Sequence, residues 1–193
     1  GQEGMSIKSQ WCELIASGKK TIEVRKTAPK ETPFRVYVYC TYGTLLYSDY
    51  PNGNDSREIK LGSFKVSGKN CLGHQMNGKV VAEWICDKVY KITQCCNGYG
   101  VSGDIALTNQ IARESCLDFP DLKKYLGDKI GYALHISALK IYDTPKELGE
   151  FHSICRYDDC NDCKRYSQNI AAPDCRIVTR PPQSWCYVEE VEE

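Results

Sequence analysis

Ten residues near the amino terminus, SGKKTIEVRK at positions 17–26, combine charged side chains of both signs with a strand-like pattern. Successive side chains of a strand point to opposite faces, so the apolar residues of TIEVR face one way and its polar residues the other. In that polar row Arg25 offers a planar fork of donors, and Glu23 an acceptor that orients the cations. Lys20, at the entrance of the row, offers a point charge. The row predicts either an anion- or base-binding site or a solvated strand face, whose ion pair would contribute under about 1 kcal/mol.

The elements expected around this row are a short helix before it and several strands after it. The apolar spacing of WCELI, with Ser9 at its start and Gly18 at its end, favours a helix. Strands are predicted at PFRVYVYCT, GKVVAEWICDKVYKI and GYALHISALKIYD, and LTNQIARESCLDFPDLKKYLGD favours a helix that breaks near Pro120. Residues 42–78, rich in Gly, Asn, Ser and Asp, are interpreted as a long hairpin or excursion. This order predicts an α+β fold, mostly antiparallel, and a small closed or nearly closed β-barrel flanked by helices.

The motif Gly18-x-Lys20-x-x-Glu23-x-Arg25 resembles the signature of the ASCH domain, a family related to PUA-like RNA-binding folds. Its surroundings agree with this resemblance. The segment SIKSQW is similar to the entry into that family's first helix, and ALHISALKIYD is similar to the family's last strand. The similarity covers about residues 5–148 of the chain.

The resemblance implies a β-barrel with a cleft between the barrel and the helices. In the family this cleft is lined by the motif and is proposed to bind RNA or a nucleoside. Carried over to this sequence, the motif places Lys20, Glu23 and Arg25 in the cleft, with Lys8 and Trp11 at its border. These five are the candidate ligand-binding residues.

The same resemblance implies two enzymatic alternatives. Some ASCH-related proteins hydrolyse N-acylated cytidine with the motif Lys, a Thr where Glu23 stands here, and a Glu beside the second helix, for which Glu114 is the match. A carboxylate at position 23 cannot act as the hydroxyl nucleophile of that scheme, and Thr21 lies two residues earlier. Other relatives are ribonucleases, in which Lys20, Glu23 and Arg25 would stabilise a phosphorane and move protons. Lys20, Glu23 and Glu114 are therefore the candidate catalytic residues.

Composition limits the kinds of partner. Of 193 residues, 41% are apolar and 26% charged, which is typical of a soluble globular protein. No apolar run approaches the roughly 18 residues of a membrane span, and no secretory signal is visible, so we expect a cytoplasmic protein without a membrane partner. Lys+Arg and Asp+Glu both number 25, which argues against tight nonspecific binding of long nucleic acid. Residues 1–40 hold seven basic and four acidic side chains, so an anion site is expected in the N-terminal part.

Twelve cysteines divide into seven dispersed ones, expected to be small buried hydrophobes, and five in the last forty residues. In a reducing cytosol clustered cysteines indicate metal rather than disulfides. The spacing C-x4-C-x2-C-x11-C predicts one structural zinc ion held by four thiolates, those of Cys155, Cys160, Cys163 and Cys175. His152 and Cys186 are reserve ligands, and disulfides or free thiols are the alternatives. No organic cofactor is expected.

Two units are predicted, an ASCH/PUA-like barrel domain at 5–148 and a Cys-rich C-terminal extension at 149–193. After a Pro-Pro pair, Trp185 and Tyr187 would anchor the extension onto the barrel, or Trp185 would reach the cleft and stack on a base. The function expected first is binding of RNA or a modified nucleoside. Hydrolysis in the same cleft and protein interaction through the zinc-bearing extension are the alternatives.

Overall fold

The computed structural model describes residues 1–193 except 44–45, 50–59, 63–74, 96–97, 155–175 and 191–193. The helical segments are α1 (Ser9–Ala16), α2 (Ile105–Ser115), α3 (Phe119–Leu126) and a 3-10 turn (Leu148–Glu150). The strands are β1 (Gln2–Ile7), β2 (Ile22–Arg25), β3 (Phe34–Cys40), β4 (Tyr47–Asp49), β5 (Lys60–Gly62), β6 (Val80–Cys95), β7 (Gly98–Gly100), β8 (Gly131–Lys146), β9 (Phe151–Ser153) and β10 (Trp185–Glu190). The fold is α+β, as the sequence predicts.

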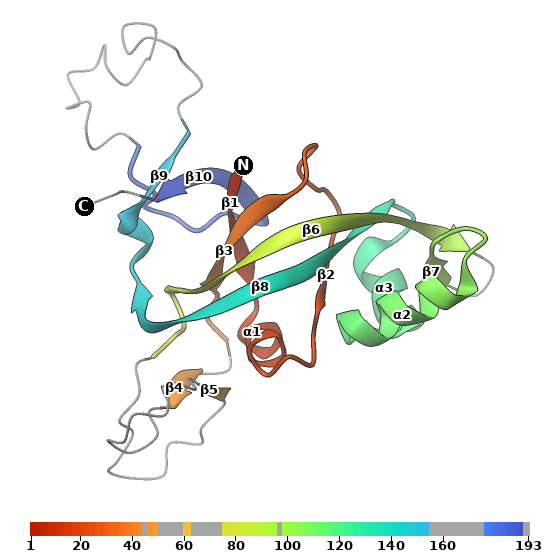
Figure 1. Ribbon diagram of the computed structural model, residues 1–193, viewed down its shortest axis with the longest axis horizontal. Helices are drawn as coiled ribbons and strands as arrows, with labels where there is room; N and C mark the ends of the chain where they lie inside the picture. Colours follow the sequence, from red (N-terminus) through yellow and green to blue (C-terminus); the bar gives the residue numbers. More distant parts are fainter. Residues whose placement is uncertain (44–45, 50–59, 63–74, 96–97, 155–175, 191–193) are drawn as a thin grey trace, which may run out of the picture.

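Most of the described strands form one mixed sheet of eight strands. Its order is β2-β8-β6-β3-β1-β10-β9, with β7 added to one end of β6, and β4 and β5 form a separate two-stranded sheet. The pairing of β1 with β3 is parallel and the other pairings are antiparallel. The two 16-residue strands β6 and β8 run along most of the molecule (Figure 1). Register shifts interrupt their ladder, and such bulges bend and twist a strand pair.

The predicted closed barrel does not appear in the described pairings. Their order begins at β2 and ends at β9, and among the described residues no strand pairing joins β2 to β1 or β9. β2 has only four residues, and its Arg25 side chain spans the gap instead, donating from Nη2 to the Ser6 carbonyl of β1 at 2.7 Å. The sheet is therefore open where the polar row of β2 lies.

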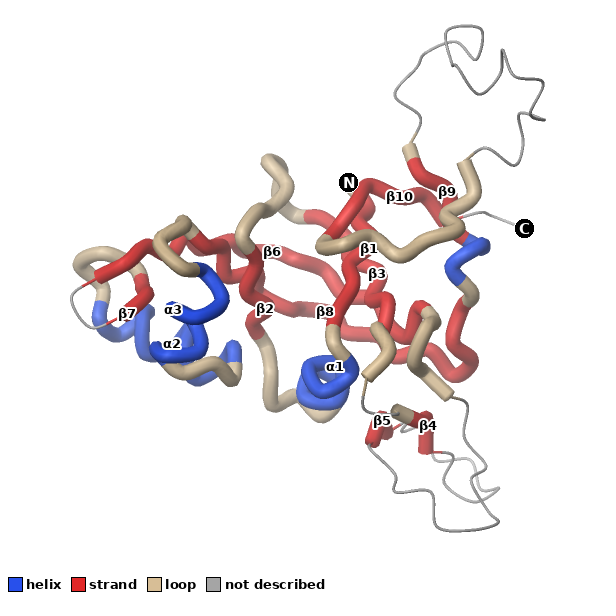
Figure 2. The backbone as a smooth tube through the Cα atoms, turned by 180° about the vertical axis from the view of Figure 1, so that it is seen from behind, coloured by secondary structure: helices blue, strands red, loops and turns tan. Residues whose placement is uncertain are grey.

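Helices cover the sheet at two places, and β2 lies between them (Figure 2). α1 packs Cys12 and Ile15 into a core cluster with Met5 and Trp84 of the sheet. α2 and α3 lie at the end of the sheet near β7, where a second cluster forms under them. Its buried members come from β2, β6, β7, β8, α2 and α3: Ile22, Val24, Ile92, Tyr99, Ile111, Leu122, Leu126 and Ala133.

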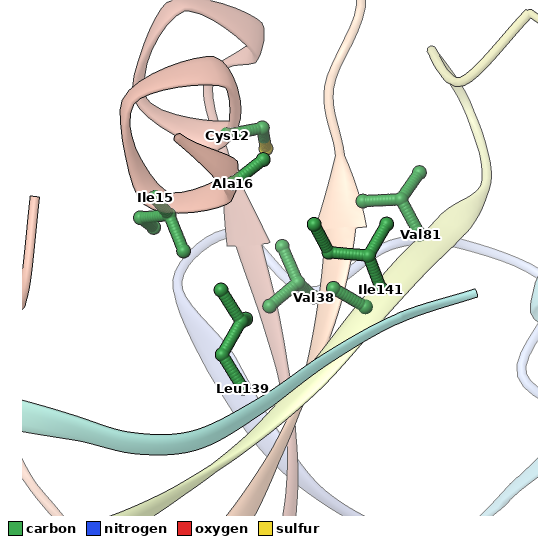
Figure 3. Close-up of a pocket in the computed structure, with 8 residues that line it drawn as sticks. Cys12, Ile15, Ala16, Val38, Val81, Leu139 and Ile141 are labelled. Carbon is green, nitrogen blue, oxygen red and sulfur yellow. The ribbon is translucent and has the colours of Figure 1, made fainter. Parts of the chain in front are cut away.

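A small cavity under α1 is part of this packing. It measures about 10 Å³, close to the smallest space that admits one water molecule. Its lining is apolar, from Cys12, Ile15, Ala16, Val38, Val81, Ala82, Leu139 and Ile141 (Figure 3). An apolar hole of this size stays dry and has no room for a ligand.

The last part of the chain belongs to the same sheet. β10 pairs with β1, with Met5 opposite Trp185, and β9 pairs with β10. Val188 and Phe151 join a third core cluster with Tyr37 and other residues of the sheet. The division at residue 148 stays a prediction, but strands from both sides of it share one sheet.

Two details differ from the sequence-based expectations. β1 begins at Gln2, before the predicted start of the domain at residue 5, and pairs there with Arg35 of β3. The residue expected to cap α1, Ser9, is its first helical residue, and Lys8 stands at the cap without a side-chain hydrogen bond. Gly18, with a φ of 75°, ends the helix region as expected, because glycine adopts this left-handed conformation without strain.

Candidate ligand-binding cleft

The three charged residues of the motif form one buried network. The carboxylate of Glu23 lies between two cations, with Oε2 3.4 Å from Lys20 Nζ and Oε1 2.9 Å from Arg25 Nε. All three residues are buried, with exposed fractions of 2% for Lys20, 6% for Glu23 and 7% for Arg25. Charges this far from water are screened little, so the network carries one net positive charge into a poorly solvated place.

β2 brings this network together because both of its faces are covered. All four of its residues are buried. Ile22 and Val24 pack into the cluster under α2 and α3, so Glu23 and Arg25 of the same strand face the opposite side. The polar row is therefore the floor of a cleft rather than a solvated strand face.

Lys20 is fixed by the end of α2. Its Nζ donates to the carbonyl of Ser115, the last residue of that helix, at 2.6 Å. The backbone reinforces this contact, because Thr21 N donates to the carbonyl of Glu114 at 2.9 Å. A cation at a helix C-terminus is stabilised by the unpaired carbonyl groups and by the helix dipole. Lys20 Nζ also lies 5.2 Å from the centre of the Trp11 ring, within cation–π range.

Arg25 joins the floor of the cleft to two other segments. Besides its bond to the Ser6 carbonyl, its Nη1 lies 3.4 Å from Ser184 Oγ, just before β10. The two terminal nitrogens of the guanidinium therefore contact Ser6 of β1 and Ser184, and its Nε faces Glu23. This pattern holds the planar group in one orientation.

A cleft of about 980 Å³ opens above this network. Five basic and two acidic side chains line it, although the whole chain has no net charge. The lining comes from α1, β2, α3 and the segments beside them: Ser6, Lys8, Gln10, Trp11, Lys20, Glu23, Val24, Arg25, Lys26, Thr27, Thr41, Leu117, Asp121, Lys124, Tyr125, Gln183 and Ser184.

A second cation–aromatic pair stands at the rim, on α3. Lys26 Nζ lies 5.1 Å from the centre of the Tyr125 ring, and Tyr125 is 39% exposed. Desolvation raises the pKa of the Tyr125 phenol, an effect that Arg25 opposes and Glu23 reinforces. The phenol therefore stays protonated at neutral pH and can donate a hydrogen bond.

Of the predicted ligand-binding residues, the structure brings Lys8, Trp11, Lys20, Glu23 and Arg25 to this one cleft. The predicted catalytic residue Glu114 is elsewhere: it is not in the lining, and its Oε2 accepts from Gln110 Nε2 at 3.0 Å along α2.

The four predicted zinc ligands lie outside the described residues: Cys155, Cys160, Cys163 and Cys175. Of the two reserve ligands, His152 lies in β9 and Cys186 in β10, opposite Gly4 of β1. Within the described parts of the chain, no three His, Cys, Asp or Glu side chains gather as a metal site. Zinc binding stays a prediction.

Two parts of the lining were missed by the sequence reasoning. Lys124 and Tyr125 lie on α3, and Gln183 and Ser184 lie just before β10. Only the second pair had a sequence pattern that could have indicated it. The Pro-Pro pair ahead of Trp185 indicates an extended segment, and such a segment needs a surface to pack on. Trp185 itself is not in the lining and donates from Nε1 to Thr27 Oγ1 at 2.9 Å.

The protein is thus of the α+β class, with an open, mostly antiparallel sheet and a polar cleft between the edge strand β2 and the helices. By sequence, no family description and no curated protein matches the chain. Two crystal structures of mutant ZmASCH from Zymomonas mobilis are similar in fold, each 15% identical and aligned over 97% of this chain. The tyrosine-to-phenylalanine mutant has a TM-score of 0.50 with 90% of its chain covered, and the serine-to-alanine mutant 0.51 with 88%.

The chain therefore has the ASCH-domain fold, as the motif resemblance predicts. At 15% identity this likeness concerns the fold alone. Among the described residues, no helix is both long and apolar enough to span a membrane.

Proposed function

We propose that the cleft binds a short single-stranded RNA or a modified nucleoside carrying phosphate. The observation that carries this proposal is the buried Lys20–Glu23–Arg25 network on the floor of the cleft. Two fixed cations around one carboxylate leave a positive charge for an anionic group, and the carboxylate remains a hydrogen-bond acceptor for a base edge. The chain has an ASCH-type fold, and proteins of the ASCH family are implicated in RNA binding and hydrolysis. This agrees with a ligand of RNA or nucleoside type.

The size and charge of the cleft favour a small ligand over a long duplex. A volume of about 980 Å³ is at the upper end of the roughly 300–1,000 Å³ of small-molecule sites, enough for a few nucleotides. The cleft lining carries more basic than acidic side chains, whereas the chain as a whole is neutral. Long duplexes require many phosphate contacts, which this surface does not supply.

Aromatic side chains on two walls suit nucleobases. Trp11 stands near Lys20 and Tyr125 near Lys26, each ring with a lysine ammonium within 5.2 Å of its centre. A base stacked on an aromatic side chain contributes about 1–3 kcal/mol, without sequence preference. The lysines beside the rings would meet the phosphates that flank a stacked base.

No specific observation favours hydrolysis. Lys20 Nζ already donates to the Ser115 carbonyl and contacts Glu23, and Glu114 lies outside the cleft lining. We therefore expect short RNAs and N-acylated cytidines to bind without turnover. Turnover that is abolished in Lys20→Ala would replace the binding proposal with the enzymatic one.

The test is equilibrium binding of fluorescent pentanucleotides by the full chain, measured by anisotropy at several salt concentrations. With two or three phosphate contacts, the log–log dependence of affinity on salt should have a slope of about −1.4 to −2.1, at about −0.7 for each phosphate. Lys124→Ala should weaken binding about two- to fivefold, since an exposed charge contact contributes under about 1 kcal/mol. Its matched control is Lys123→Ala, an exposed neighbour on α3 outside the cleft lining.

A second pair of variants tests stacking. Tyr125→Leu should weaken binding about tenfold, because a stacked base is lost. Tyr42→Leu is the control, as Tyr42 is 72% exposed and outside the lining. Absence of binding, or equal effects of the cleft variants and their controls, would contradict the proposed function.

A further inference from the structure

Residues 182–185, here called the C-terminal segment, are fastened to the β1 side of the cleft. Ser6 Oγ donates to the carbonyl of Pro182 at 2.5 Å, and Ser6 N donates to the carbonyl of Ser184 at 3.0 Å. Both bonds join positions about 176 residues apart in the sequence. One residue of β1 thus holds the backbone on either side of position 183.

The same segment is fastened to the β2 side. Ser184 Oγ is the partner of Arg25 Nη1 at 3.4 Å, and Trp185 Nε1 donates to Thr27 Oγ1 at 2.9 Å. Trp185 also packs against the core cluster under α1. The C-terminal segment therefore crosses the open gap between β1 and β2 and forms one wall of the cleft, in a fixed position.

Gln183 is the residue of this wall that the fold leaves unengaged. It lies between the two anchors, is exposed, and lines the cleft. Among the described residues its side-chain amide makes no hydrogen bond, whereas both of its neighbours bond to Ser6. A primary amide offers two donors and one acceptor, side by side.

We propose that Gln183 sets the base preference of the cleft by bonding to the edge of a nucleobase. This inference rests on the proposed function and goes beyond it by naming the residue that selects the ligand. The charged side chains of the lining hold phosphate, and phosphate contacts position a nucleic acid without reading its sequence. An amide instead matches an adjacent donor and acceptor, as on adenine, and single-stranded RNA exposes those edges.

The expected ligand is therefore a strand with an unpaired base of a preferred type. Stacking on Tyr125 or Trp11 tolerates every base, so discrimination has to come from a hydrogen-bonding group near the rings. Glu23 is engaged by Lys20 and Arg25. Gln10 and Gln183 are the primary amides of the lining, and of the two Gln183 lies between neighbours that are both bonded to Ser6, which fixes its position. A base that lacks the matching edge would leave this amide unpaired on binding.

The experiment compares pentanucleotides of A, C, G and U against the full chain by fluorescence anisotropy at one salt concentration. Wild type should show at least a tenfold spread between the best and the poorest base. Gln183→Ala should reduce that spread to within about threefold, by weakening the best ligand and leaving the poorest unchanged. Gln183→Glu should weaken all four and change their order, because it removes two donors and adds a negative charge.

Gln94→Ala is the matched control, since Gln94 is an exposed glutamine of β6 outside the lining. The thermal unfolding midpoint of Gln183→Ala should equal that of wild type, because the side chain is exposed and bonds to no described residue. A wild-type protein that binds all four bases equally, or a Gln183→Ala variant that keeps the spread, would overturn this inference and leave the proposed function standing. No binding by wild type would remove both.

Discussion

Replacing Glu23 by Gln tests whether the floor of the cleft is a buried charge network. The substitution keeps the size of the side chain and one acceptor oxygen, but it removes the negative charge that pairs with both Lys20 and Arg25. Both cations would then stay buried, at 2% and 7% exposure, without their counter-charge. We expect the folded state to lose stability and the ligand site to lose its geometry.

The magnitude follows from the burial of the partners. Removing one member of a buried ion pair costs about 3–5 kcal/mol, whereas an exposed pair contributes about 0–1 kcal/mol. Gln retains an acceptor, and Lys20 keeps its bond to the Ser115 carbonyl, so a loss of about 3 kcal/mol is expected. At a urea m-value of about 2 kcal/mol per molar, the unfolding midpoint should fall by about 1.5 M.

The assay is urea unfolding followed by circular dichroism, with Glu189→Gln as the control. Glu189 pairs with Arg176 on the surface, with side-chain exposures of 55% and 36%, so that variant should lose under about 1 kcal/mol. Lys20→Met combined with Glu23→Gln should cost less than the sum of the two single changes, because the two groups interact directly. If Glu23→Gln lowered the free energy of unfolding by less than about 1 kcal/mol, the buried network would be refuted, and the polar row would behave as a solvated strand face.

Three further outcomes are expected. Burial raises the pKa of the Glu3 carboxyl from 4.5 to about 8. As the pH rises, the unfolded chain loses this proton at a lower pH than the folded protein does. The free energy of unfolding should therefore fall between about pH 4.5 and 8, by up to about 1.4 kcal/mol per pH unit. Glu3→Gln should lack this slope in urea unfolding at pH 5, 6.5 and 8. Gly100→Ala should destabilise the fold by about 1–3 kcal/mol in thermal unfolding, because the added Cβ would collide with Thr108 of α2, whereas the control Gly149→Ala has room. Protein purified under reducing conditions without chelator should hold close to one zinc per chain, and Cys160→Ser should hold little; zinc near zero in wild type would remove the metal prediction.

The sequence could predict what depends on short-range patterns. Alternation along TIEVR separated Glu23 and Arg25 from Ile22 and Val24. In the structure Ile22 and Val24 belong to the core cluster under α2 and α3, and Glu23 and Arg25 line the cleft, which Val24 also reaches. The strands β3, β6 and β8 and the break between α2 and α3 are confirmed at nearly the predicted residues. These features follow from local propensity, periodicity and Pro or Gly positions, which one stretch of sequence contains in full.

Tertiary structure alone decided which distant segments meet at the motif. Lys20 Nζ bonds to a carbonyl 95 residues away, and Arg25 reaches a serine 159 residues away, so no local pattern could indicate either contact. The same long-range packing keeps Glu114 out of the cleft, brings Tyr125 to its rim, and leaves the sheet open between β1 and β2. The residue types and spacing of the motif determine the chemistry at positions 20, 23 and 25. Their burial depends on which helices and strands surround them. Burial in turn sets how strongly the three charges interact, because screening by water is removed only when distant segments pack over them.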